Sequence, residues 1–428
     1  MIRLDSADPG FEAEFAAFIA KPRGAPEVVD AAVAEIIERV RSEGVGALLE
    51  FTQRFDGVSL AEADLRVRPD EIDAGVASCP FAVREALALA AARIRAWHIH
   101  QQPSDGEFTD EAGVTLGWRW SPLDAVGIYV PGGRAAYPST VLMNAVPAAV
   151  AGVSRIAMVT PPGRLAPSVL AAAKEAGVTE IWRIGGAQAV AALAYGAGPI
   201  SPVDKIVGPG NAYVAAAKRR VYGQVGIDSL AGPSEIVVVA DDSANPAWLA
   251  ADLLSQAEHD PDAQSIFITN SRRLADEVEA EIERQLQSLA TSAVATASWR
   301  HHGAVILCPL ERAPELVDAI APEHVEFALD DAEGIAARVR HAGAIFLGAH
   351  APEAVGDYVA GTNHVLPTSG TARFSSGLST TDFMKRTSVT RLGSAAFSRI
   401  AGAAEALAEA EGLPAHARSL ALRRKDSA

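Results

Sequence analysis

The sequence is poor in cysteine, in aromatic residues and in basic residues. Only two of its 428 residues are cysteine, Cys79 and Cys308, and aromatic residues make up 6%. Two cysteines cannot form a disulfide framework, so they indicate a reducing compartment. The chain has 37 Lys and Arg against 53 Asp and Glu, a net charge of −16. This charge argues against a nucleic-acid partner and an anionic membrane surface, because both need a basic patch.

Long apolar runs are also missing. No uninterrupted apolar stretch reaches the roughly 18 residues that would suggest a membrane span, and even residues 141–153 are broken by Asn144 and Pro147. Residues 1–15 lack the basic start and apolar run of a signal peptide. We therefore expect a cytoplasmic protein without a membrane partner.

What is present is typical of a large α/β protein. The length allows two or three domains and a sizeable core. From Asp124 onward, short β-rich runs alternate with alanine-rich helical runs, which predicts βαβ units and parallel sheets covered by helices. Two α/β layers, about residues 125–233 and 234–370, fit better than one very wide sheet. The predicted strands are residues 125–130, 155–160, 180–184, 205–207, 236–240, 265–269, 304–308 and 344–347.

The two ends of the chain are predicted to be helical. Residues 26–41 carry an apolar stripe at helical spacing, and a second helix is expected at residues 81–97. His98 and His100 follow that helix and are interpreted as surface residues. Near the other end, a helix is expected at residues 394–411, followed by a short tail that holds His416.

Three of the predicted strands end in glycine-rich turns, at residues 131–133, 185–188 and 208–211. Glycine lets backbone N–H groups approach a phosphate at the start of the next helix. None of the turns spells G-x-G-x-x-G. Glycine is also routine turn chemistry after a strand, so a nucleotide site and ordinary turns both stay open here.

A predicted helix from Pro246 brings two polar side chains together at its end. Asn245 is a good capping residue, and Asp260-Pro261 stops the helical run. Gln256 and His259 are three apart on one face of the last turn, where an amide oxygen and an imidazole can converge. Taken alone, such a pair is more often ordinary surface.

Further polar segments could contribute to a site together with Gln256 and His259. Ser234 precedes a predicted strand, Glu323-His324 follows a predicted helix, and Asp357 leads into a glycine-rich segment ending in His364. Carboxylates, imidazoles and an amide oxygen form a plausible ligand set for zinc. The sequence lacks H-E-x-x-H and paired C-x-x-C, so a metal site requires these segments to meet in space.

The adjacent Glu323 and His324 suit acid–base chemistry, because imidazole titrates near neutrality and a carboxylate can activate water. Neighbours on an ideal strand point to opposite faces. Both can therefore serve one site only if the backbone after Pro322 is irregular; the alternative is an exposed pair at a helix end. Cys308 lies in a hydrophobic strand and is interpreted as core packing rather than a nucleophile.

Taken in order, these segments resemble the histidinol dehydrogenase family from about residue 115 to 423. The matching stretches are VGIYVPGGRAAYPSTVLMNAVPA, IGGAQAVAALAYG, KIVGPGNAYVAAAKR, GIDSLAGPSEIVVVAD, DLLSQAEHDPDAQ, PEHVEF, GDYVAGTNHVLPTSGTARFSSGLSTTDFMKR and EGLPAHARSLALR. Eight long motifs in register are far more specific than any one glycine turn.

The resemblance implies two Rossmann-like parallel-sheet α/β domains with small helical N- and C-terminal segments. It implies a NAD-binding domain at residues 125–233, and a domain of residues 25–124 plus 234–380 that carries the zinc and catalytic residues. Residues 1–24 and 381–428 would be the helical end segments. The implied reaction is the oxidation of L-histidinol through L-histidinal to L-histidine, in histidine biosynthesis, with two NAD⁺ reduced.

The resemblance also implies residue roles. One zinc ion per subunit would be bound by Gln256, His259, Asp357 and His416, and His416 would reach the partner's site in a homodimer. His324 would act as the base in hydride loss and Glu323 would activate water. The implied substrate contacts add Ser234 and Glu411, together with His324 and the zinc ligands, and the implied NAD contacts are Tyr129, Gln188 and Asn211.

Two other readings stay open from the sequence. One is a related zinc- and NAD-dependent dehydrogenase of another small alcohol, against which Glu411 and His416 speak. The other is a non-catalytic metal- or nucleotide-binding protein, which would have no need of the Glu323-His324 pair.

Overall fold

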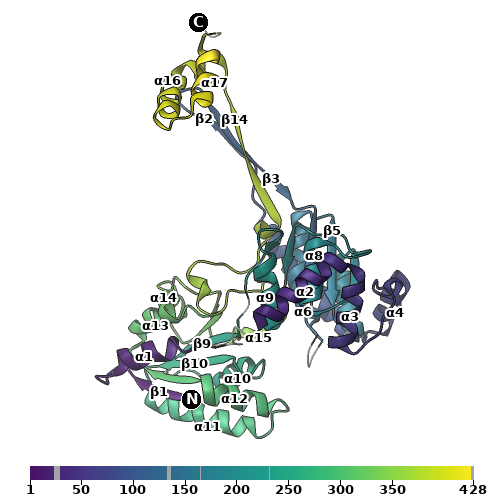
Figure 1. Cartoon of the computed structure of the whole chain (residues 1–428). Coiled ribbons are helices and arrows are strands. Elements are labelled where there is room, and N and C mark those ends of the chain that lie inside the picture. Colours follow the sequence, from purple (N-terminus) through teal and green to yellow (C-terminus); the bar gives the residue numbers. More distant parts are fainter. Residues whose placement is uncertain (24–28, 133–135, 164, 231, 426–428) are drawn as a thin grey trace.

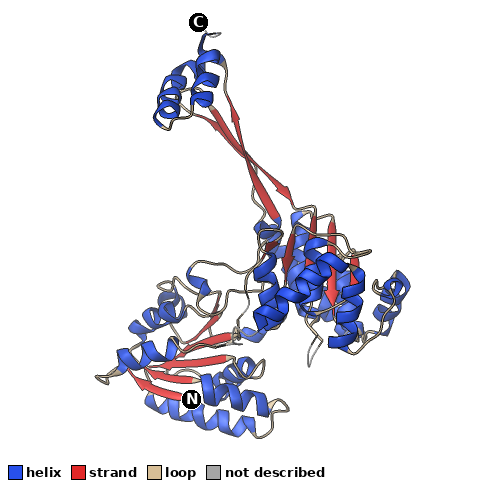
Figure 2. Ribbon diagram, in the orientation of Figure 1, coloured by secondary structure: helices blue, strands red, loops and turns tan. Residues whose placement is uncertain are grey.

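The protein, described here from a computed structural model, consists of two parallel sheets covered by helices and a long arm (Figure 1). The structure describes residues 1–23, 29–132, 136–163, 165–230 and 232–425. Helices lie on the faces of both sheets, and the arm leads away from the sheets to a separate helical tip (Figure 2).

The first sheet has the strand order β6-β5-β4-β7-β8, and all of its strand pairs are parallel. Its first strand in the chain, β4, therefore lies beside the fourth, β7, and the direction of winding reverses between them, as in a Rossmann fold. The strands are β4 (Ala125–Tyr129), β5 (Arg155–Thr160), β6 (Glu180–Arg183), β7 (Lys205–Val207) and β8 (Gly226–Ile227). The connecting helices are α6 (Pro138–Ala151), α7 (Pro167–Ala176), α8 (Gly186–Tyr195) and α9 (Ala212–Val221).

The second sheet repeats this winding, with the order β1-β11-β10-β9-β12-β13 and parallel pairs throughout. Its reversal lies between β9 and β12. The strands are β9 (Glu235–Ala240), β10 (Gln264–Thr269), β11 (Ala304–Leu307), β12 (His324–Ala328) and β13 (Ala344–Leu347). The helices are α10 (Pro246–Ala257), α11 (Arg272–Leu286), α12 (Ser292–His302), α13 (Ala313–Ile320) and α14 (Ala332–Ala336). The prediction of two parallel-sheet α/β domains is confirmed.

Both faces of the second sheet are buried. Along β9, Ile236 and Val238 pack into the cluster that holds α10 and α11, while Val237 and Val239 pack into the opposite cluster. A strand buried on both sides reads as a continuous apolar run, which is why I-V-V-V-A predicted it. Full burial of a Val or Ile side chain stabilises the fold by about 1.5–3 kcal/mol, so this strand is a rigid base for the residues at its start.

The N-terminal segment differs from the expected helical segment. It opens with the strand β1 (Ile2–Asp5), which pairs with β11 at the edge of the second sheet, and continues into α1 (Phe11–Ile19). A four-residue strand with two apolar side chains carries too little pattern to be predicted, since its place depends on pairing with residues some 300 positions away.

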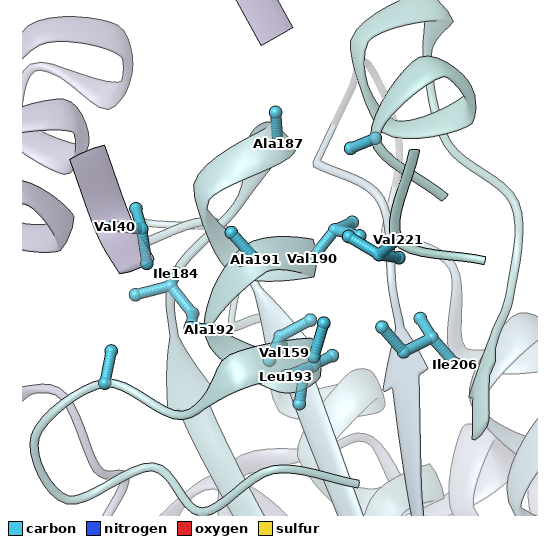
Figure 3. Close-up of a cluster of buried hydrophobic side chains, with 14 of the residues drawn as sticks. Val40, Val159, Ile184, Ala187, Val190, Ala191, Ala192, Leu193, Ile206 and Val221 are labelled. Atoms are coloured by element: carbon cyan, nitrogen blue, oxygen red, sulfur yellow. The ribbon is translucent and has the colours of Figure 1, made fainter. Parts of the chain in front are cut away.

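Helices α2 (Val29–Glu43), α3 (Val45–Asp56), α4 (Pro69–Ser78) and α5 (Phe81–Ile99) pack against helices α6 to α9, which cover the first sheet. The expected stripe is confirmed, since Val33, Ile36 and Val40 are buried, although residues 26–28 lie outside the described part. Figure 3 shows Val40 in one cluster with side chains of α8 and its neighbouring strands. The expected division joined residues 25–124 to residues 234–380. In the structure, helices α2 to α5 share hydrophobic clusters with residues 125–225, and the division into domains stays a prediction.

Helices α4 and α5 have the length and composition of a membrane span only when they are taken together. Within the described ranges, no single helix is long and apolar enough to cross a membrane; α4 and α5 meet the length and composition test together, with a bend of 110° between them.

The arm is a three-stranded antiparallel sheet in the order β14-β3-β2. Its strands are β2 (Gly106–Thr109), β3 (Thr115–Pro122) and β14 (Met384–Arg391), and its tip carries α16 (Ser394–Ala410) and α17 (Pro414–Lys425) (Figures 1 and 2). The C-terminal segment was expected to be helical with a short tail after residue 411. Instead it starts with β14, whose side chains are largely exposed and show no apolar alternation, and the expected tail is the helix α17.

Candidate functional site

The predicted catalytic residues gather at the amino ends of β9 and β12, the neighbouring strands at the reversal point of the second sheet. Open α/β sheets usually bind ligands at the carboxyl ends of their strands, so this site uses the opposite edge. Helix α10 follows β9 and returns to that edge, which places its carboxyl end there. The partial negative charge of a helix carboxyl end favours a cation.

Helix α10 delivers the first pair of candidate ligands. Asn245 caps it as predicted, accepting a hydrogen bond from the Ala247 amide at 2.9 Å. Gln256 is fully buried in its last turn, and His259 follows two residues after the helix ends. The side-chain amide of Gln256 lies 3.5 Å from Nδ1 of His259. Nδ1 of His259 is also 2.8 Å from the Ser255 carbonyl, to which it donates, so Nε2 keeps the lone pair for a ligand.

His324 is the first residue of β12 and is 4% exposed. Its Nδ1 donates to the carbonyl oxygen of Glu235 at 3.0 Å. A carbonyl can only accept, so Nδ1 carries the proton and Nε2 is the basic nitrogen. Among the described residues Nε2 has no hydrogen-bond partner, and it lies 3.9 Å from Oδ1 of Asp357. Burial lowers the pKa of His324 to about 4, which keeps the ring neutral at physiological pH.

Glu323 is buried beside it, so the alternative of an exposed pair is wrong. Its carboxyl accepts a hydrogen bond from the Glu235 amide at 3.1 Å and lies 3.8 Å from Nδ1 of His324. Burial raises the pKa of Glu323 well above its ordinary value, and a hydrogen bond from Ser234 works against this rise. The required irregularity is present: Ala321 has a φ of 49° and β12 begins only at His324, so Glu323 precedes the regular strand.

Asp357 comes from the short helix α15 (Glu353–Tyr358). Its Oδ1 lies 3.8 Å from Nδ1 of His364, and that Nδ1 is 3.0 Å from the main-chain oxygen of Asp357. Atoms of His324, Glu353 and Asp357 that could act as ligands all lie within 4.8 Å of one another, an arrangement able to hold a metal ion. The structure thus brings Gln256 and Asp357 to the His324 ring, while His259 contacts Gln256.

Two predicted site residues do not join this group. His416 lies on α17 and Glu411 follows α16, and both are exposed at the tip of the arm, far from α10 and α15 (Figure 1). A site that uses them has to receive them from a second copy of the chain.

The predicted NAD residues lie at the carboxyl edge of the first sheet. Tyr129 ends β4, and its hydroxyl accepts a hydrogen bond from the Gly186 amide at 2.9 Å. Gln188, on the first turn of α8, is 1% exposed, yet neither polar atom of its side chain has a partner in the described part of the chain. Asn211 caps α9 through its oxygen, which accepts from the Tyr213 and Val214 amides, and this leaves its amide nitrogen for another partner.

A buried ion pair fixes the turn that carries Asn211. Lys218 and Asp228 contact each other in the interior. Lys218 donates to the Gly208 carbonyl at 3.0 Å, and Asp228 accepts from the Gly208 amide at 2.7 Å. Gly208 has a φ of 106°, and a Cβ atom on it would lie 2.3 Å from the Tyr129 carbonyl oxygen. Only glycine fits where the ends of β4 and β7 approach this closely.

Other sequence interpretations fare differently. Cys308 is buried, and burial raises its pKa to about 11, which fits core packing rather than a nucleophile. The surface interpretation of His98 is wrong: it is fully buried, 2.8 Å from Gln101 and 3.2 Å from the Asn363 side chain. A helix-end histidine looks exposed in sequence when the loop that covers it comes some 265 residues later.

Sequence reasoning missed Glu353, Glu235 and the placement of His364. Glu353 stands four residues before Asp357, the spacing that puts two side chains on one helix face. That signal becomes readable only once residues 353–358 are known to form a helix.

Comparison with known proteins shows which family the chain is similar to. The sequence model of the histidinol dehydrogenase family matches residues 20–424. The chain is 67% identical to histidinol dehydrogenase of Caulobacter vibrioides over 423 residues, covering 99% of both chains, and 57% identical to that of Rhodospirillum rubrum, covering 99% of this chain and 98% of the other. The crystal structure of histidinol dehydrogenase from Elizabethkingia anophelis matches with a TM-score of 0.94 at 35% identity, over 100% of this chain and 98% of that one. The chain belongs to the histidinol dehydrogenase family of oxidoreductases.

Proposed function

We propose that this protein oxidises L-histidinol through L-histidinal to L-histidine, the last steps of histidine biosynthesis, and that it uses zinc and NAD⁺ as a homodimer in the cytoplasm. The observation that carries the proposal is the basic Nε2 of His324, which has no partner among the described residues and lies 3.9 Å from the carboxylate of Asp357. A neutral base beside metal-ligating groups is what the oxidation of a bound alcohol requires.

The residues present fit a zinc ion. Nitrogen and oxygen donors are the common zinc ligands besides thiolates. Here they are the free Nε2 of His259, the amide oxygen of Gln256 and the carboxylate of Asp357. In the proposal the fourth ligand is His416 of a second copy, because the arm holds this residue away from its own site (Figure 1).

The residues present also fit NAD. Tyr129, Gln188 and Asn211 lie around the reversal point of the first sheet, where α/β folds bind nucleotides. The buried, unpartnered amide of Gln188 supports a ligand there, because such groups are costly when left unpaired. We keep residues 125–233 as the proposed extent of this NAD-binding domain and residues 234–380 as the main part of the other.

When bound, zinc would hold the imidazole and amine of the substrate, and NAD⁺ would accept the hydride from its alcohol carbon. Nε2 of His324 takes the hydroxyl proton as that hydride leaves, which gives the aldehyde. Glu323 then takes a proton from the water that adds to the aldehyde carbon. The resulting gem-diol would lose the second hydride to a further NAD⁺ and a hydroxyl proton to solvent, which gives the carboxylic acid. Ser234 lies against Glu323 and Glu411 would come from the second copy to hold the substrate.

The test is an assay of the purified protein with zinc, NAD⁺ and L-histidinol. We expect two NADH for each L-histidinol consumed, loss of activity after chelation and recovery with zinc. Turnover of another small alcohol without NADH from L-histidinol would assign the protein to a related dehydrogenase instead. Zinc bound without turnover of any alcohol would favour a binding protein.

A further inference from the structure

Three elements form the proposed zinc and proton-transfer site, and each carries a second residue on the same face as its site residue. Residues four apart on a helix, or two apart on a strand, share one face. This second residue carries a carboxyl group on all three elements. The pairs, second residue first, are Asp252 and Gln256 on α10, Glu326 and His324 on β12, and Glu353 and Asp357 on α15.

Two of these three carboxyl groups are shut off from solvent, whereas Asp252 is partly exposed. Glu326 is 1% exposed and Glu353 is 2% exposed. One carboxyl oxygen of each has no hydrogen-bond partner in the described ranges. Burying a carboxyl group without partners costs folding free energy, so such a group calls for a structural or functional explanation. Glu353 does not contact substrate in the proposed mechanism, so its role there has to act through a neighbour.

That neighbour is Gln256. With the nitrogen facing outward, the inward oxygen would meet two acceptors, the Glu235 carbonyl and Oε1 of Glu353, and only one donor, Nδ1 of His324 at 3.2 Å. The amide therefore fits better with its nitrogen facing inward. The nitrogen then donates to Oε1 of Glu353 at 3.0 Å and to the carbonyl oxygen of Glu235 at 3.2 Å. The oxygen of Gln256 consequently takes the outward position, 3.5 Å from His259. If residue 353 offered no acceptor, the Gln256 nitrogen would lose its shortest inward hydrogen bond. The two orientations of the Gln256 amide would then differ much less in energy.

We propose that Glu353 is a positioning residue that holds the Gln256 nitrogen inward, and thereby turns the Gln256 oxygen toward the cation. The inference rests on the proposed function, because it assumes a cation bound by Gln256. Glu353 and Asp357 share one helix, so the same short element both orients one ligand and supplies another. Partners of this kind typically change metal affinity by about 10–100-fold when removed.

The experiment measures zinc affinity by competition with a chromogenic chelator, using full-length protein freed of metal. Glu353→Gln keeps an oxygen that can accept from Gln256 and should keep an affinity close to that of the wild type. Glu353→Met fills the same space without an acceptor, and its dissociation constant for zinc should rise about 10–100-fold. Glu333→Met, an exposed glutamate in the first turn of α14, is the matched control and should leave zinc affinity unchanged.

A double-mutant cycle separates positioning from a general structural effect. In a Gln256→Ala background there is no amide to orient, so Glu353→Met should no longer weaken zinc binding. The proposal is overturned if Glu353→Met costs the same in both backgrounds, if it costs nothing in the wild type, or if Glu353→Gln is as weak as Glu353→Met. The last result would assign the effect to charge. If Glu353→Met does not fold, Glu353→Ala gives the same comparison, with folding checked by thermal unfolding of the metal-free proteins.

Failure of this inference and failure of the proposed function give different results. Wild-type protein that binds no zinc, or a Gln256→Ala variant with unchanged zinc affinity, would count against the proposed ligand set. Zinc binding that depends on Gln256 but not on Glu353 would overturn only the positioning role.

Discussion

Nδ1 of His324 lies 3.0 Å from the carbonyl oxygen of Glu235 on the neighbouring strand, and this contact decides which ring nitrogen is basic. Because β9 and β12 are paired in register, the carbonyl is held by the sheet itself rather than by a mobile side chain. The ring is thereby locked with Nε2 toward Asp357. Because the tautomer of His324 is already fixed in the folded protein, the reaction does not have to include a change of tautomer.

Replacing this base should stop the chemistry and leave binding largely intact. We expect His324→Asn to lower the overall rate by about 10²–10⁴-fold, the usual contribution of a general base. The binding constant for L-histidinol, measured by calorimetry, should change much less. A variant that oxidises L-histidinol at near wild-type rate would remove His324 from the role of base.

Glu323 should matter more for the second oxidation than for the first. Glu323→Gln keeps the shape of the buried side chain but cannot take a proton from water. We expect NADH formation from L-histidinal to fall more than the first hydride transfer from L-histidinol, measured in single-turnover experiments. Equal loss in the two steps would contradict the division of roles between Glu323 and His324.

The arm predicts that subunits complement one another. His416 lies on α17 at the tip of the arm, whereas Gln256 lies on α10 in the body, so one site in the proposed homodimer would draw on both chains. We expect His416→Asn and Gln256→Ala homodimers to lose activity, and a mixed heterodimer to regain one competent site. The control is a mixture in which both variants carry the same substitution. Absence of recovery in the heterodimer would mean that all ligands come from one chain.

The buried carboxyl group of Glu326 predicts an unusual dependence of stability on pH. Burial first, and the neighbouring Asp252 carboxyl second, raise the pKa of Glu326 from 4.5 to about 9. Between these values the folded protein keeps a proton that the unfolded chain releases. The free energy of unfolding should therefore fall as pH rises through this window, by up to about 1.4 kcal/mol per pH unit for one full proton.

Glu326→Gln removes that proton exchange and should flatten the dependence. The measurement is the urea midpoint of metal-free wild type and variant between pH 6 and pH 8. The wild-type midpoint should fall relative to that of the variant as pH rises. Parallel curves would show that Glu326 is not protonated in the folded state.

Much of the fold could be read from local pattern. The continuous apolar runs of β4, β5, β9 and β10 predicted parallel strands because both of their faces are covered by helices. Asn245 and Pro246 predicted the start of α10, since capping and N1 preferences act within a few residues. The family resemblance rests on motifs of the same kind and is confirmed over residues 20–424.

The arm and the strand β1 could not be read in this way. The side chains of β14 are mostly exposed, so the strand has no buried face to mark it, and its partner β3 lies more than 260 residues earlier. The same holds for His98, whose burial depends on a loop around Asn363. Contacts between residues so far apart in the chain cannot be predicted from the local sequence pattern.

By itself the sequence determined which residues can do chemistry here: an amide and an imidazole at a helix end, an acid beside a histidine, and glycines at the ends of three strands. Only the tertiary structure decided where they act. The candidate site lies at the amino edge of the second sheet, where Glu323 and His324 are both buried. Glu353 lies against the Gln256 amide, and the arm that carries His416 leads away from the site. The physical reason is that side-chain types and spacings are local, whereas burial, tautomer and ligand geometry are fixed by neighbours brought from distant parts of the chain.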